Sequence, residues 1–229
     1  MLSIAVIIPM KPLASSKSRL APHLSDWQRE AIASRMFWTV LEAATASRQI
    51  SATWVVGGDS AVQRIAAQTG AEWHDDAGAP LNAALEAAFA QWFRREGDAA
   101  LFLPADLPLV TAQDIDALIA ASGKLRSAVF SPALRDGGTN AILMPRDVAF
   151  PLQLGEGSFQ RHIIESARRS APIAYHFSRT VGLDVDTIED LQTWRSLKPD
   201  AFITPDSWDL AKSRSEVLRE RKEQAFRDH

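Results

Sequence analysis

Short hydrophobic runs alternate with helical patterns along most of this chain, and this alternation limits the folds that are open to it. Residues 3–8 are typical of a buried strand, whereas residues 26–46 carry apolar side chains at the spacing of one helix face. Repetition of this unit predicts an α/β fold with a doubly wound, mostly parallel sheet, whose ligands bind at the carboxyl ends of the strands. The expected strands are 3–8, 53–56, 72–73, 99–103, 127–131, 140–144, 173–177 and 183–185, and the expected helices are 26–46, 60–69, 81–92, 158–169 and two that begin near Thr111 and Thr187.

The length and the composition predict one domain followed by a short extension. With 229 residues and 46% hydrophobic content, the chain can bury one substantial core. We expect residues 1–198 to form that domain. Residues 199–229 are expected to be a charged, helical C-terminal extension without chemistry of its own, because both signs of charge are mixed along it.

Charge and cysteine content exclude several classes of partner and chemistry. The net charge of -3 argues against nucleic acid as a partner, and the absence of cysteine rules out disulfides, thiolate zinc sites and cysteine nucleophiles. The apolar start of about nine residues is too short to span a bilayer and lacks the basic region of a signal peptide. We therefore expect a cytoplasmic protein with no membrane partner, and the sequence leaves its oligomeric state open.

A basic loop follows the first expected strand without a break. The segment PMKPLASSKSRLAP, residues 9–22, places Lys11, Lys17 and Arg19 among small residues just past the carboxyl end of that strand. Cations at this position usually face an anion. Because residues 9–20 contain no glycine, the loop is not a phosphate loop of the Walker type, and its side chains would have to hold the phosphates. The alternative is a solvated loop without a ligand.

Three aspartates stand where strands are expected to end. Asp106 lies in FLPADLPLV, where flanking prolines fix the backbone, and Asp184 and Asp186 lie two residues apart in GLDVDTIEDL. Magnesium is often held by one or two carboxylates together with substrate phosphates, so these acids predict a Mg²⁺ site. A structural alternative remains for Asp186, which could instead cap the helix that begins near Thr187.

Several segments together carry a family resemblance. KPLASSKSRLAPHLS, LNAALEAA, LPADLPLV, DGGTNAILM, GEGSFQRH and LDVDTIEDL appear in this order, and together they resemble the CofC/FbiD family, the guanylyltransferases of coenzyme F420 biosynthesis. The resemblance runs from the first expected strand to about residue 197. It does not extend into the C-terminal tail.

The resemblance implies a nucleotidyltransferase fold of the GT-A-like kind and transfer of GMP from GTP, with magnesium, to a phosphorylated three-carbon acid. Pyrophosphate would leave, and the acceptor would be 2-phospho-L-lactate, phosphoenolpyruvate or 3-phospho-D-glycerate. The preference for guanine rests on the resemblance alone. The residues expected to act are Lys17 and Asp106 in catalysis; Lys11, Lys17, Arg19 and Asn82 in nucleotide binding; Thr139, Gly155 and Ser158 in acceptor binding; and Asp106, Asp184 and Asp186 in metal binding.

The glycine-rich start of a helix is compatible with an acceptor site. Gly155 to Ser158 open the helix expected over 158–169, where free N–H groups and the positive end of the helix dipole favour an anion. Ser158 could instead be an ordinary N-cap. Arg161 and His162 are expected to lie on a solvated helix face. Asn82 has the same alternative as Ser158, because it also stands near a helix start.

Other functions remain open at this point. The same fold would suit another nucleotidyltransferase, such as a relative of the molybdopterin cytidylyltransferases, although their glycine-rich signature is missing at residues 9–20. A GT-A glycosyltransferase would use Asp184 and Asp186 as an Asp-x-Asp motif, which normally lies nearer the middle of the chain. A non-catalytic nucleotide-binding protein is the third alternative, and the presence of both the cations and the acids argues against it.

Overall fold

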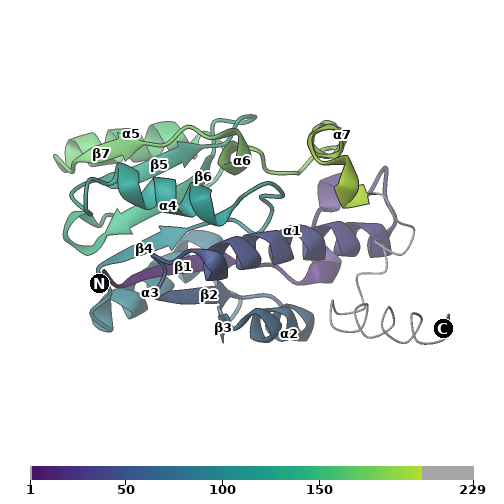
Figure 1. Cartoon of the computed structure of the whole chain (residues 1–229), viewed down its shortest axis with the longest axis horizontal. Helices are drawn as coiled ribbons and strands as arrows, with labels where there is room; N and C mark the ends of the chain where they lie inside the picture. Colours follow the sequence, from purple (N-terminus) through teal and green to yellow (C-terminus); the bar gives the residue numbers. More distant parts are fainter. Residues whose placement is uncertain (1, 203–229) are drawn as a thin grey trace, which may run out of the picture.

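The apolar run near the start of the chain becomes strand β1 (Ile4–Pro9), which lies inside a seven-stranded sheet. In this computed structural model, which describes residues 2–202, helices cover both faces of the sheet (Figure 1). Residues 4–8 have no exposed surface, because alternate side chains of the strand enter two different cores.

The elements follow the predicted alternation of strands and helices. In chain order they are β1, the 3-10 helices η1 (Leu13–Ser15) and η2 (Ser18–Leu20), α1 (Asp26–Ala46), β2 (Ala52–Val56), α2 (Ser60–Thr69), β3 (Glu72–His74), α3 (Leu81–Arg94), β4 (Ala99–Phe102), α4 (Ala112–Ala121), β5 (Ala128–Pro132), β6 (Thr139–Pro145), η3 (Arg146–Val148), α5 (Ser158–Arg168), β7 (Ile173–Tyr175), α6 (Arg179–Gly182), α7 (Ile188–Leu197) and η4 (Pro199–Phe202).

The strand order is β3-β2-β1-β4-β6-β5-β7, and most of the pairing is parallel, as predicted. Strand β1 is parallel to both β2 and β4, β2 is parallel to β3, and β5 is parallel to β7. Strand β6 is the exception, because it runs antiparallel to β4 and to β5. Its first residues therefore lie at the same edge of the sheet as the carboxyl ends of β1 and β4.

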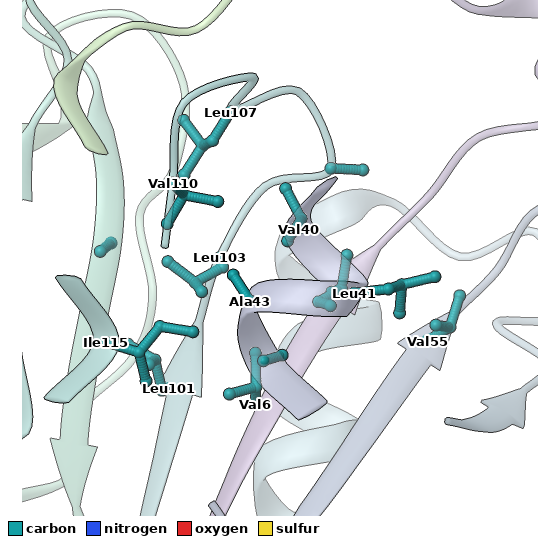
Figure 2. Packing of buried hydrophobic residues seen from close by; sticks show 14 of the residues in the cluster. Val6, Val40, Leu41, Ala43, Val55, Leu101, Leu103, Leu107, Val110 and Ile115 are labelled. Atoms are coloured by element: carbon teal, nitrogen blue, oxygen red, sulfur yellow. The ribbon is translucent and has the colours of Figure 1, made fainter. Parts of the chain in front are cut away.

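Two hydrophobic cores hold the helices against the sheet. The core on one face joins Val6 and Leu101 of the sheet to side chains of α1, α2 and α4, and Figure 2 shows its centre around Leu41 and Ile115. The core on the other face joins alternate strand residues to α3 and contains Leu85, Phe89 and Trp92 of that helix. Burial on both faces fixes the register of the strands, because a slip of one residue would exchange the two sets.

The short strand expected at 183–185 is absent, and this prediction was wrong. The segment is extended, but only the N–H of Val185 reaches a neighbouring backbone, donating to the carbonyl of Asp106 at 3.3 Å. Leu183 and Val185 are buried among helices, in a third cluster with Met36 of α1 and Trp194 of α7. An alternating apolar pattern therefore packs against helices here, while it keeps Asp184 and Asp186 on the opposite side.

The C-terminal end of the described chain packs against the same cluster. Residues 199–202 form η4, and Ala201 is buried. The remainder of the expected helical extension, residues 203–229, lies outside the described residues. Within the part of the chain that is described, no helix is long and apolar enough to cross a bilayer.

Candidate active site

The basic loop after β1 turns back toward the sheet edge through the two 3-10 helices η1 and η2. Leu13 and Leu20 are buried and anchor the loop, and the Arg29 guanidinium of α1 donates a 2.9 Å hydrogen bond to the carbonyl of Ser16. Lys17, between the two turns, has a left-handed backbone with φ 55°. This conformation costs a non-glycine residue about 1–2 kcal/mol, and such strain is concentrated at functional sites.

The Lys17 side chain points into the protein and joins two of the predicted acids. Its Nζ lies 2.7 Å from Oδ2 of Asp106 and 3.0 Å from Oδ1 of Asp186, and its side chain is 7% exposed. Burial by itself would lower the pKa of the ammonium, but the charges and hydrogen bonds of the two aspartates outweigh it and raise the pKa above its usual value. Lys17 is therefore a fixed cation at neutral pH.

Two arginines complete the charge pattern around Asp186. Arg19 Nη1 lies 3.1 Å from one oxygen of Asp186, and Arg135 Nη2 lies 3.4 Å from the same oxygen. Burial would raise the pKa of the Asp186 carboxyl, but the nearby charges of Lys17, Arg19 and Arg135 hold it below its usual value. Asp186 is accordingly ionised. Metal binding by Asp186 stays a prediction.

Arg135 was not identified from the sequence, although it lies at the centre of the acidic side chains. It extends from the connection between β5 and β6 and comes within 3.6 Å of Asp136, Asp184 and Asp186, with its Nε 3.3 Å from Asp190. In the sequence it stands directly before Asp136-Gly137-Gly138, whose paired glycines are typical of a turn. The signal that could have revealed it is an arginine directly before a glycine-rich turn that connects two strands.

Asp184 differs from Asp186 in its environment. Burial raises the pKa of its carboxyl, and the charge of Asp106 raises it further. Its Oδ1 accepts a 3.1 Å hydrogen bond from the side chain of Asn140, which also donates to the carbonyls of Val181 and Gly182. Asn140, like Arg135, was not predicted from the sequence, and its side chain fixes the backbone that carries Asp184.

The geometry of the acids is compatible with magnesium only if substrate phosphates supply part of its ligands. Within residues 2–202, no three His, Asp or Glu side chains are grouped so that they would chelate an ion, and Lys17 Nζ lies between Asp106 and Asp186. Oδ1 of Asp106, however, is buried and has no hydrogen-bond partner. A buried carboxylate oxygen without a partner is costly, so it indicates a ligand. One or two carboxylates and the phosphates of a substrate would satisfy magnesium.

Two of the three predicted acceptor residues, Thr139 and Ser158, meet where β6 begins. Thr139 Oγ1 and Ser158 Oγ are 2.9 Å apart, and both residues are buried. Ser158 is not the N-cap of α5, because Gly157 holds that position in a left-handed conformation. The N–H of Phe159 donates to the carbonyl of Gly137, so the hairpin between β5 and β6 is joined to the helix start.

The expectation of a solvated helix face is correct for Arg161 and wrong for His162. Arg161 is exposed, whereas His162 has no exposed surface and its ring stacks on Phe130 with centroids 5.4 Å apart. The buried face of α5 is in fact polar, since Ser158, His162 and Ser166 occupy it at four-residue spacing. A search for an apolar helix face cannot detect such a stripe.

The family is decided by comparison with known proteins. The family described as "Guanylyl transferase CofC like" matches residues 4–194. The chain belongs to this family. A phosphoenolpyruvate guanylyltransferase of Sphaerobacter thermophilus is 37% identical over 187 residues, 81% of this chain and 89% of that protein. A 2-phospho-L-lactate guanylyltransferase of Methanothermobacter thermautotrophicus is 32% identical (81% of each chain), and a 3-phospho-D-glycerate guanylyltransferase of Phenylobacterium zucineum is 31% identical (80% of this chain, 86% of that protein).

Solved structures confirm the predicted nucleotidyltransferase fold of this CofC-like enzyme. A putative nucleotide-diphospho-sugar transferase from Desulfovibrio desulfuricans G20 superposes with a TM-score of 0.72 and 16% identity, over 100% of this chain and 98% of that one. CMP:2-keto-3-deoxy-manno-octonic acid synthetase in complex with CTP gives a TM-score of 0.60 and 14% identity, over 87% and 100%. At these identities the likeness concerns the fold, while the family match favours a guanylyltransferase over the glycosyltransferase alternative.

Three other predicted residues of the CofC-like enzyme are not part of either cluster. Asn82, the second residue of α3, uses its side-chain amide on Leu154, with Oδ1 accepting from the Leu154 N–H at 2.9 Å and Nδ2 donating to its carbonyl at 3.4 Å. Gly155 has φ 122° in the loop that precedes α5. Lys11 is exposed at the start of the basic loop. Nucleotide binding by Lys11 and Asn82 and acceptor binding by Gly155 stay predictions.

Proposed function

We propose that this enzyme transfers GMP from GTP to a phosphorylated three-carbon acid, with magnesium, in coenzyme F420 biosynthesis. The observation that supports it most is the buried Lys17 ammonium held between Asp106 and Asp186 at the carboxyl edge of the sheet. Fixed cations at this edge suit a nucleoside triphosphate. The relatives named for phosphoenolpyruvate, 2-phospho-L-lactate and 3-phospho-D-glycerate support an acid acceptor.

The proposed reaction is a displacement at the α-phosphorus of GTP. An oxygen of the acceptor's phosphate forms the new P–O bond, and the bond from the α-phosphorus to the α,β-bridging oxygen breaks, so pyrophosphate leaves with the electron pair. The acceptor phosphate is already an anion at pH 7, and no strong general base is needed. When bound, magnesium would be held by one or two of the carboxylates of Asp106, Asp184 and Asp186 together with the substrate phosphates, whose charge it would neutralise.

The side chains of this enzyme then act by position and by charge. Lys17, with its proton retained by its two aspartates, and Arg19 would face the triphosphate and offset the charge that develops on the leaving pyrophosphate. Arg135 contacts the acids of the charged cluster, and it extends from the hairpin whose other end carries Thr139. It would keep two anionic substrates from repelling each other.

A pyrophosphate-release assay tests the proposal directly. It crosses GTP, ATP and CTP with 2-phospholactate, phosphoenolpyruvate and 3-phosphoglycerate, each with magnesium and with a chelator. We expect release with GTP and one of the acids, in magnesium only. Release from CTP but not GTP, or no release in any well from folded protein, would overturn guanylyl transfer to these acids.

A further inference from the structure

The polar face of α5 continues inward from the hydroxyl pair to His162, and each hydrogen bond there has a direction. The backbone N–H of Gln153 lies 2.9 Å from Nε2 of His162. A backbone amide can only donate, so Nε2 is the acceptor and carries no proton. The imidazole therefore joins the segment that precedes the Gly155 loop to the helix that follows the loop.

The remaining ring nitrogen must then be the donor. Burial, together with the neighbouring positive charge of Arg161, lowers the pKa of His162 from its usual value of 6.5 to about 4, so the ring is neutral at pH 7. Its single proton lies on Nδ1, which is 3.1 Å from Oγ1 of Thr139. Because the ring donates this proton, the oxygen of Thr139 accepts, and its own hydroxyl proton remains available for a different partner.

That partner is Ser158, the last residue of this chain of hydrogen bonds. Thr139 Oγ1 lies 2.9 Å from Ser158 Oγ, where either oxygen could donate. Within residues 2–202 the structure records no other acceptor for the Thr139 hydroxyl proton, so we assign that proton to Ser158. The proton of the serine hydroxyl must then point away from Thr139. Within residues 2–202, the contact with Thr139 is the only hydrogen bond that the structure records for Ser158 Oγ.

We propose that His162 is a positioning residue for the acceptor. It fixes the direction of the hydrogen bonds that run from His162 through Thr139 to Ser158, so that the Ser158 hydroxyl is presented as a donor. This inference rests on the proposed function. An anionic phosphate or carboxylate needs donors, and a serine that donated back to Thr139 would offer it a lone pair instead. The direction of these hydrogen bonds therefore favours a ligand group that accepts hydrogen bonds, as the phosphate and carboxylate of the acid do.

The loop that precedes α5 is held by two side chains of that helix, Arg161 and His162. Arg161 donates to the carbonyls of Gln153 at 3.0 Å and of Glu156 at 2.6 Å, so it fixes the loop from the solvent side while His162 fixes it from the inside. Ser158 has no exposed surface, so an acceptor reaches its hydroxyl only when the adjoining loop moves. Gly155 and Gly157, both with positive φ, give the loop that freedom.

Two variants of His162 separate its two hydrogen bonds. In His162→Gln, the amide can reach the place of Nε2 and keep the contact with Gln153 but not that with Thr139. In His162→Asn, the shorter amide can reach the place of Nδ1 and keep the donor to Thr139 but not the contact with Gln153. We expect His162→Gln to raise the KM for the acid about tenfold, the effect of one lost hydrogen bond at a polar site, with little change in the KM for GTP. His162→Asn should raise it less.

A control variant and a spectroscopic measurement complete the test. Met144→Ala removes a buried side chain from the same strand as Thr139, so it lowers stability but leaves the hydrogen bonds of His162, Thr139 and Ser158 in place. The KM for the acid should not change. ¹⁵N NMR of the histidine rings should show Nδ1 protonated and Nε2 unprotonated in His162.

The outcomes are distinct. An equal KM for the acid in His162→Gln and wild type, a larger effect of His162→Asn than of His162→Gln, or a ring protonated on Nε2 would each overturn the inference while the wild type is active. A wild-type enzyme that turns over none of the acids would overturn the proposed function, and the inference with it.

Discussion

The two halves of the candidate site offer an anion opposite kinds of contact. At the ends of β1 and β4, Lys17 and its aspartates form a cluster of full charges that is partly open to solvent. At the start of β6, Thr139, Ser158 and His162 form a neutral chain that is buried. Charges attract over distance and tolerate small displacements, whereas hydroxyl groups act only in contact and in one orientation. The first half suits a mobile triphosphate, and the second suits a small acid of fixed shape.

The largest effect should follow a change in the charged half. Asp106→Asn removes the carboxylate that carries a buried oxygen without a partner, and we expect turnover to fall about a thousandfold, as for the loss of an electrostatic contact in a transition state. Thermal unfolding should stay cooperative. The exposed Asp147→Asn is a matched control for the loss of one negative charge, and near-normal turnover in Asp106→Asn would remove this residue from the mechanism.

A smaller effect is expected for Arg135, which lies in the hairpin that connects β5 to Thr139. Arg135→Gln leaves the surrounding aspartates without their shared cation, and it should lower kcat/KM for the acid by about a hundredfold, within the range for losing a charged hydrogen-bond partner. Steady-state kinetics with each substrate varied in turn would measure it. The exposed Arg126→Gln is the control. An effect confined to the KM for GTP would place Arg135 in the nucleotide half instead.

The neutral half should respond more selectively. Ser158→Ala removes one hydroxyl from the chain, and the KM for the acid should rise about tenfold, while the KM for GTP changes less. Ser166→Ala, on the same buried face of α5 and two turns further along, controls for the loss of a buried hydroxyl. Equal changes in both KM values would contradict the division of the site into two halves.

The last prediction concerns the stability of the protein and its dependence on pH. The pKa of His162 is lowered to about 4 in the folded protein from its usual value of 6.5, so its contribution to folding is complete above pH 6.5 and is lost as the pH falls toward 4. That contribution is about 3 kcal/mol in the free energy of unfolding. Arg161 is the charged group that acts on the ring; Phe130, Thr139, Ser158 and Gln153 are its other neighbours, and none of them titrates in this range.

Denaturant unfolding of wild type and His162→Asn at several pH values would measure this contribution. The difference in unfolding free energy between the two proteins should narrow between pH 7 and pH 4. A constant difference would contradict a buried, neutral histidine.

The charged half could be predicted from the sequence because strand ends and charged residue types are both visible there. Residues 9–22 and Asp106 each follow an apolar run, and the parallel sheet brings such ends together. The neutral half was only partly visible. Thr139 and Ser158 were identified through the family resemblance, but His162 is buried by Phe130, a residue distant in sequence, and no local pattern encodes that contact.

Other differences have the same physical origin. The segment 183–185 has the alternation of a strand but packs against α1 and α7, so burial was predicted correctly and its partner was not. Arg135 and Asn140 lie in and beside a turn signal, which revealed the backbone path and concealed the side chains. Local propensity thus located the elements, whereas the contacts between them depend on the whole chain.

Strand β6 has a consequence for how such an enzyme can diversify. Because it runs against its neighbours, Ile142 faces Phe102 and the earlier residue Thr139 lies beyond the last paired residue of β4, on the side where Asp106 stands. The hairpin that leads into β6 therefore determines where Thr139 lies relative to the rest of the sheet. Changing the length of this hairpin would move Thr139 without disturbing β1. Related enzymes could in this way exchange one small acid for another and keep the residues that follow β1 unchanged.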